Sequence, residues 1–168
     1  MQVLSRRLGV GLTGLAAAAA LAVPMAGQAD AATSTVLLHT QTTIPKLLTE
    51  SPSGLVTMEQ APLGGNPNQR WVKTDTDSGF ATYTSVSSIG PGKKPHCLTG
   101  RGAQGFPVVT AEICVPGATK QQWRLGVSGD FQLRLNGLVA GVNSSNNSGV
   151  LMQFFTAKPD QKWHTHPA

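Results

Sequence analysis

Aromatic and charged residues are both scarce in this chain of 168 residues, at 5% and 12%. So few charges exclude a coiled coil and an acidic disordered tail, because both need many charged residues. The 19 glycines and 11 prolines indicate many turns, but they stay below the share typical of low-complexity chains. Hydrophobic residues make up 40% of the chain, which is enough for one core, so we expect a single domain.

The first 31 residues have the three parts of a secretory signal peptide. Arg6 and Arg7 form a basic start, residues 8–26 are apolar, and Ala29-Asp30-Ala31 is a small-x-small cleavage site. A membrane anchor is the alternative, but the stretch is only weakly apolar and no charged stop-transfer cluster follows it. We expect cleavage after Ala31, a mature domain over 32–168, and a secreted, extracellular protein that does not stay on the membrane.

Basic residues outnumber acidic ones by 13 to 8, which gives a formal net charge of +5. In the mature chain they are scattered, and only Lys93 and Lys94 are adjacent. Proteins that bind nucleic acids usually gather such residues in a stripe. We therefore expect a mildly basic surface and no nucleic-acid partner.

The mature chain consists of short segments with strand-like character. These segments are rich in β-branched or aromatic residues, or alternate in polarity, and turn residues bound them. No stretch sustains a helical period. The pattern predicts an all-β domain, with strands at residues 36–38, 55–58, 80–83, 108–110, 131–135 and 150–154.

Three Q-x-W triplets contain all three tryptophans of the chain. The triplets are Gln69-Arg70-Trp71, Gln121-Gln122-Trp123 and Gln161-Lys162-Trp163, and successive tryptophans are 52 and 40 residues apart. A strand that opens with valine and then a turn with glycine or proline precede each triplet. Such regular self-similarity indicates one supersecondary unit repeated three times, since a single unit cannot bury its apolar face alone.

This pattern resembles the ricin B-chain type β-trefoil lectin family over nearly all of the mature chain. The resemblance implies a β-trefoil fold, with three pseudo-symmetric repeats around one axis. It implies that Trp71, Trp123 and Trp163 pack in the shared core. It also implies that the three glutamines of the triplets, among them Gln121 and Gln161, form hydrogen bonds near each sugar pocket.

The two cysteines stand where this family places a disulfide within a repeat. Cys97-Leu98-Thr99 is similar to the C-L-D start of a family repeat, and Cys114 precedes the second triplet. Export favours oxidised cysteines. The resemblance thus implies a Cys97–Cys114 disulfide in repeat two, while repeats one and three have apolar residues near these places, at Leu47, Ala61, Leu138 and Phe155.

The family's sugar-binding residues are matched only in part. The family uses an aspartate that accepts sugar hydroxyls, a stacking aromatic ring and an Asn-Gln pair. The aspartate positions hold Thr49, Thr99 and Ala140, the ring positions Glu59, Glu112 and Gln153, and the asparagine positions Asn68, Lys120 and Asp160.

Repeat one comes nearest to the family's sugar site. Its candidate ligand-binding residues are Thr49, Glu50, Asn68 and Gln69, with Glu50 as the acceptor in place of the missing aspartate. A shallow pocket without a stacking ring has little apolar area to bury, so we expect weak binding.

Two classes of function remain open. The first is a non-catalytic, lectin-like module that binds a carbohydrate, either a glycan or a polysaccharide. The second is a protein-binding module, such as an inhibitor of a protease or other enzyme, because trefoil loops can vary freely. Such a module would use the long loop from Thr84 to His96, which carries Lys93 and Lys94.

No catalytic or metal-binding motif stands out in the sequence. It lacks G-x-S-x-G, H-E-x-x-H and a P-loop, so we expect no enzyme activity, no cofactor and no metal site. His39 and His96 have no ligand-like spacing. We assign His164 and His166 to a flexible C-terminal tail.

Overall fold

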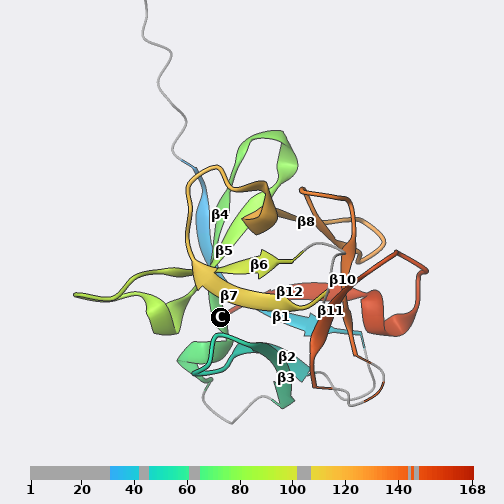
Figure 1. The fold of residues 1–168 in the computed structure, drawn as a ribbon, viewed down its shortest axis with the longest axis horizontal. Helices are drawn as coiled ribbons and strands as arrows, with labels where there is room; N and C mark the ends of the chain where they lie inside the picture. The colour runs from blue at the N-terminus through green and yellow to red at the C-terminus, as the bar shows by residue number, and fades with distance from the viewer. Residues whose placement is uncertain (1–30, 42–45, 61–64, 102–106, 144, 146–147) are drawn as a thin grey trace, which may run out of the picture.

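The computed structural model describes residues 31–168, except 42–45, 61–64, 102–106, 144 and 146–147 (Figure 1). The predicted signal peptide lies outside the described residues apart from Ala31. Twelve β-strands and five short 3₁₀ turns form the regular structure of the described part, which confirms the all-β prediction. Within these ranges, no helix has the length and apolarity needed to cross a bilayer.

The strands fall into three consecutive groups of four. Repeat one holds β1 (Thr33–Thr40), β2 (Lys46–Glu50), β3 (Val56–Gln60) and β4 (Arg70–Asp75). Repeat two holds β5 (Ala81–Ser85), β6 (His96–Gly100), β7 (Val109–Ile113) and β8 (Trp123–Leu125). Repeat three holds β9 (Phe131–Leu133), β10 (Val139–Val142), β11 (Val150–Gln153) and β12 (Trp163–Pro167).

A 3₁₀ turn precedes the last strand of every repeat. These turns are η1 (Pro67–Gln69), η4 (Thr119–Gln121) and η5 (Pro159–Gln161), and each one ends on the glutamine of a Q-x-W triplet. Two further turns, η2 (Asp77–Gly79) and η3 (Val86–Ser88), flank β5. The triplet therefore marks the same turn-to-strand junction three times.

The first and last strands of the repeats form a closed ring. Antiparallel pairing joins them in the order β12, β1, β4, β5, β8 and β9. A bridge between Asp130 and Lys162 closes the ring between β9 and β12. Closure leaves this sheet without an exposed edge that could pair with other chains.

The second and third strands of each repeat form a hairpin, and the three hairpins pair in a cycle. The hairpins are β2–β3, β6–β7 and β10–β11. Equivalent backbone bonds link each to the next: Ala111 N to Gly54 O at 2.8 Å, Met58 N to Ser148 O at 2.7 Å, and Met152 N to Pro107 O at 2.6 Å. A six-stranded barrel with three cyclically linked hairpins is a β-trefoil, as predicted.

The three tryptophans occupy equivalent places in the core. Each is 0% exposed. Each indole N–H donates to a backbone carbonyl of its own repeat, at Leu48 (3.0 Å), Leu98 (2.8 Å) and Ala140 (2.8 Å). This confirms the predicted equivalence and burial of Trp71, Trp123 and Trp163.

The prediction that His164 and His166 lie in a flexible C-terminal tail is wrong. Trp163–Pro167 forms β12, where His164 lies opposite His39 and His166 opposite Leu37 on β1. The strand forms because its backbone closes the barrel, which the polar sequence W-H-T-H-P does not reveal.

Candidate functional site

The same buried frame lies beneath the expected sugar pockets of repeats one and two. Gln69 and Gln121 are 1% exposed, and their side-chain amides donate to Thr49 Oγ1 at 3.2 Å and Thr99 Oγ1 at 3.0 Å. Both threonines in turn donate to a backbone carbonyl two residues earlier. Two of the four residues predicted to bind a ligand, Thr49 and Gln69, are thus buried and bonded to each other.

Repeat three keeps the glutamine, but its register differs from the one predicted. Because Trp163 bonds to Ala140 O, Ala140 is equivalent to Leu48 and Leu98. Gly141, rather than Ala140, therefore takes the aspartate position, and Val139, rather than Leu138, takes that of Cys97. A Cβ atom on Gly141 would lie 2.9 Å from the side chain of Gln153.

The pocket position of repeat three is filled by the protein itself. The side chain of Gln153 lies over Gly141, and its Oε1 accepts a hydrogen bond from Gln161 Nε2 at 3.0 Å. Gln161 also donates to Phe154 O at 2.8 Å and is 1% exposed. Asp160, the counterpart of Asn68, has no side-chain hydrogen bond within the described residues, so it is Gln153 that occupies this position.

The pocket position of repeat two is closed by charges. Glu112 accepts hydrogen bonds from Arg101 Nε at 2.8 Å, Lys120 Nζ at 3.0 Å and Thr110 Oγ1 at 3.1 Å. Partial burial by itself would raise the pKa of Glu112, but the bonds from Lys120, Arg101 and Thr110 outweigh it and lower the pKa. The carboxylate stays ionised and engaged.

Repeat one is the repeat whose outer residues remain open. Glu59 is exposed and, among the described residues, accepts one hydrogen bond, from Thr57 Oγ1 at 3.1 Å. The side-chain amide of Asn68 is half-buried and forms no hydrogen bond within the described part of the chain. An amide offers both donors and acceptors to hydroxyl groups.

A groove of about 420 Å³ is lined by Asn68 on one side. It runs between the end of β2, the turn η1 and the inserted segment (residues 86–95), which projects from the body at the left of Figure 1. Its lining residues are Glu50, Ser51, Pro52, Asn68, Ser87, Ser88, Lys93, Lys94 and His96. The structure thus brings Glu50 and Asn68, both predicted ligand residues, to one groove.

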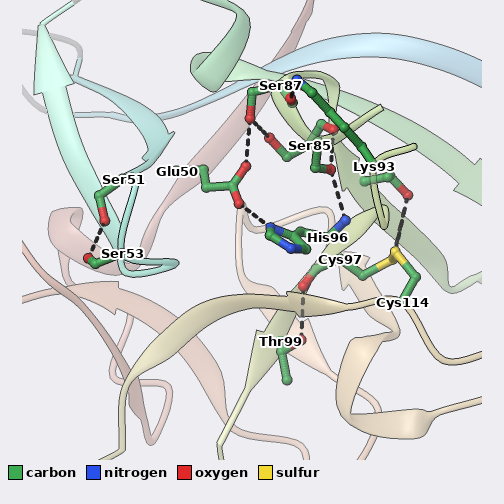
Figure 2. A network of polar contacts seen from close by, with 12 residues as sticks. Glu50, Ser51, Ser53, Ser85, Ser87, Lys93, His96, Cys97, Thr99 and Cys114 are labelled. Carbon is green, nitrogen blue, oxygen red and sulfur yellow. Dashed lines mark hydrogen bonds and ion pairs between the residues drawn. A yellow bond between two sulfur atoms is a disulfide. The ribbon is translucent and has the colours of Figure 1, made fainter. Parts of the chain in front are cut away.

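Glu50 lies between Ser87 and His96 and so bonds near both ends of the inserted segment, as Figure 2 shows. The residue is 6% exposed, and its carboxylate accepts hydrogen bonds from Ser87 Oγ at 2.8 Å and His96 Nδ1 at 2.7 Å. An ionised carboxylate only accepts, so Nδ1 of His96 carries the proton. Both oxygens of Glu50 are therefore engaged, and its predicted role as a sugar acceptor stays a prediction.

The disulfide and further hydrogen bonds fix the end of the inserted segment. Cys97 and Cys114 are bonded, which confirms the predicted bridge. Cys114 N donates to Pro95 O at 2.9 Å, and His96 N donates to Ser88 Oγ at 2.8 Å. The segment is exposed at its tip but held at its base.

Histidines of β1 and β12 form a second cluster. The ring of His39 stacks on His166 with centroids 4.7 Å apart and lies 5.4 Å from His164. Burial lowers the pKa of His39, and the two other histidines lower it further, against a hydrogen bond with Thr40 O that raises it. The described residues contain no group of three or more His, Cys, Asp or Glu side chains suited to a metal.

Sequence reasoning missed Ser87, Ser88 and His96 as groove residues. Glu50 and His96 are 46 positions apart, so only the fold brings them together. The available signal was the length of the insertion, because it adds surface beside repeat one.

The chain matches no protein-family model and no curated protein. Among solved structures it is similar to the designed three-fold symmetric protein ThreeFoil, with a TM-score of 0.65, 18% identity, and 80% of this chain and 99% of that one covered. The agglutinin from Abrus precatorius matches with a TM-score of 0.60 and 14% identity, and the match covers 81% of this chain and 47% of the agglutinin chain. The C-half of the earthworm R-type lectin, solved in complex with GalNAc, matches with a TM-score of 0.58 and 12% identity, and the match covers 80% of this chain and 99% of the lectin chain. At these identities the likeness shows the β-trefoil fold.

Proposed function

We propose that this protein is a secreted, non-catalytic carbohydrate-binding module whose working site is in repeat one. The observation that carries the proposal is the contrast between the repeats. Gln153 and the Arg101–Glu112–Lys120 cluster fill two pocket positions, whereas Glu59 and Asn68 leave the third open. The agglutinin and earthworm lectin with similar folds support a lectin-like use of this frame.

Binding at a single site of this kind is weak. The amide of Asn68 provides hydrogen bonds to sugar hydroxyls, but Glu59 stands where a ring would stack and bury apolar area. We expect a Kd no better than about 1 mM, which corresponds to about −4 kcal/mol. Retention on an insoluble polysaccharide remains measurable because the polymer presents many copies of the sugar at a high local concentration.

A glycan array and polysaccharide pull-downs with residues 32–168 test the proposal. Asn68→Ala should abolish most of the retention. Asp160→Ala, at the equivalent position of repeat three, is the matched control and should retain the ligand. Unchanged retention of the Asn68 variant would place the site elsewhere, and no retention of the parent on any glycan would overturn the proposal.

A protein-binding role is the second candidate, and the inserted segment favours it. Residues 91–95 are exposed. Their backbone is held by the disulfide at the base of the segment and by a turn in which Lys93 N donates to Gly90 O at 3.1 Å. A loop held in one conformation loses little entropy on binding. Inhibition of a lysine-specific serine protease, lost in Lys93→Ala/Lys94→Ala, would support this candidate. Lack of inhibition across a protease panel would count against a protease-inhibitor role.

A further inference from the structure

The accessible charge of the groove beside Asn68 is positive. Lys93 and Lys94 are exposed and line it. Among the described lining residues Glu50 is the one carboxylate, and it is buried with both oxygens bonded. A ligand that enters the groove therefore contacts the ammonium groups of the two lysines, while the carboxylate of Glu50 is buried and already bonded.

His96 adds a directed polar group to the same wall. Its Nδ1 is committed to Glu50, which orients the ring, and 37% of the side chain is exposed. The other ring nitrogen, Nε2, accepts a hydrogen bond from a hydroxyl when neutral and donates one to an anion when protonated. Lys93 Nζ donates to Ser87 O at 2.8 Å, which leaves two of its three donors for a ligand.

The groove is a feature of one repeat boundary and does not belong to the threefold frame. Ten residues, 86–95, connect β5 to β6, whereas five connect β1 to β2 and five connect β9 to β10. The extra residues supply Ser87, Ser88 and both lysines of the lining. A cationic wall is thus placed beside the one repeat whose pocket position is open.

We propose that this groove binds an acidic saccharide, that is, a sugar residue with a carboxylate or sulfate group. The anionic group lies against Lys93, Lys94 and His96, where charge-assisted hydrogen bonds are stronger than neutral ones. The ring hydroxyls lie toward the Asn68 amide. This inference rests on the proposed carbohydrate-binding function and specifies the class of its ligand.

Three soluble polymers test the inference by affinity electrophoresis of residues 32–168 at about 150 mM salt, where weak long-range attraction is screened. Polygalacturonate carries carboxylates, dextran sulfate carries sulfates, and dextran is the neutral reference. We expect retention by at least one acidic polymer and stronger retention than on dextran. The two acidic polymers show which anion is preferred.

Two double variants distinguish binding in the groove from unspecific attraction of the polymers to a positively charged protein. Lys93→Ser/Lys94→Ser removes both groove lysines and should weaken retention about tenfold or more. Lys158→Ser/Lys162→Ser removes the same charge at residues outside the lining and should weaken it less than twofold. Equal loss in both variants, or no loss in the first, would overturn the inference. An unchanged unfolding temperature of the first variant confirms that it is folded.

The outcomes also separate this inference from the function on which it rests. Retention on a neutral glycan that depends on Asn68, without preference for acidic polymers, would overturn the acidic ligand and support carbohydrate binding. No retention on any polymer or glycan would overturn both.

Discussion

Repeats one and two have the same buried frame but opposite outer layers. The hydrogen bonds that Thr49, Gln69 and Trp71 donate in one repeat match those that Thr99, Gln121 and Trp123 donate in the other. Above the frame, repeat two joins Glu112 to two cations, while repeat one leaves Asn68 open. The comparison teaches that the fold and the pocket are separable: the frame keeps the shape, and a few outer side chains decide whether a ligand can enter.

The frame itself differs at one atom. In repeats two and three the glutamine Oε1 accepts a backbone N–H, from Val115 at 2.8 Å and from Thr156 at 2.7 Å. The equivalent position in repeat one is Pro62, which lies outside the described residues and has no N–H in any conformation. Gln69 Oε1 accordingly has no partner among the described residues. The open repeat also has the less complete frame.

The largest expected effect is the loss of stability when a core tryptophan is replaced, and it tests whether repeats one and two contribute equally to the core. Trp71→Ala and Trp123→Ala should each lower the free energy of unfolding by about 3–5 kcal/mol, because both rings are fully buried. Urea denaturation of both variants measures this. A difference of several kcal/mol between them would show that the repeats are not energetically equivalent.

The disulfide distinguishes repeat two from repeat one. Replacing Cys97 and Cys114 by serine should cost about 3 kcal/mol, since the closed loop of 17 residues regains entropy when unfolded. Thermal unfolding with and without reductant gives the comparison for the parent. Mass spectrometry of residues 32–168 should show a two-proton difference between the untreated and the reduced protein, and free thiols in the untreated protein would contradict the bridge.

A stacking ring should sharpen the contrast in ligand binding. Glu59→Trp adds apolar area beside Asn68 and should tighten saccharide binding by up to about tenfold. Glu112→Trp in repeat two is the control and should bind no more tightly than the parent, because repeat one is unchanged and Lys120 stands in place of the asparagine in repeat two. Isothermal titration of the two variants against the same saccharide decides between them. An equal gain over the parent in both variants would show that repeat two accepts a ligand as readily as repeat one.

The smallest effect concerns the two glutamates. Glu112→Gln should cost about 0.5–1 kcal/mol at pH 7, because its ion pairs are partly exposed, whereas Glu59→Gln should change stability very little. The lowered pKa of Glu112 means that its contribution is full above its unfolded pKa and is lost as the pH falls through the folded value. Urea denaturation between pH 7 and pH 3 measures both variants. Identical pH profiles would contradict this role of Glu112.

The sequence predicted the repeats, the buried tryptophans and the disulfide. Tryptophan and cysteine are rare in this chain, so the three Q-x-W triplets and the two cysteines could be assigned to equivalent places of the repeats without ambiguity. Six of the twelve strands were predicted. Among those missed, β4 reads R-W-V-K-T-D and β12 reads W-H-T-H-P, and their pairing comes from barrel closure, which local pattern does not show.

Register and groove were harder to predict, for physical reasons. In repeat three no cysteine marks the start, and Leu138, Val139 and Ala140 are all apolar, so an error of one residue leaves the pattern unchanged. The groove depends on contacts between Glu50, Ser87 and His96, which come from two repeats. Neither the carboxylate nor the histidine stands out by itself.

The pairing of β1 with β12 has a consequence for how the chain is made. These strands hold the two ends of the domain, with Val36 opposite Pro167 and Thr40 opposite Trp163. Until β12 is in place, β1 lacks one of its neighbours and the barrel stays open, with strand edges exposed. Closure of the barrel is therefore a late step of folding, because it joins strands at opposite ends of the domain and needs contacts between residues far apart in the sequence.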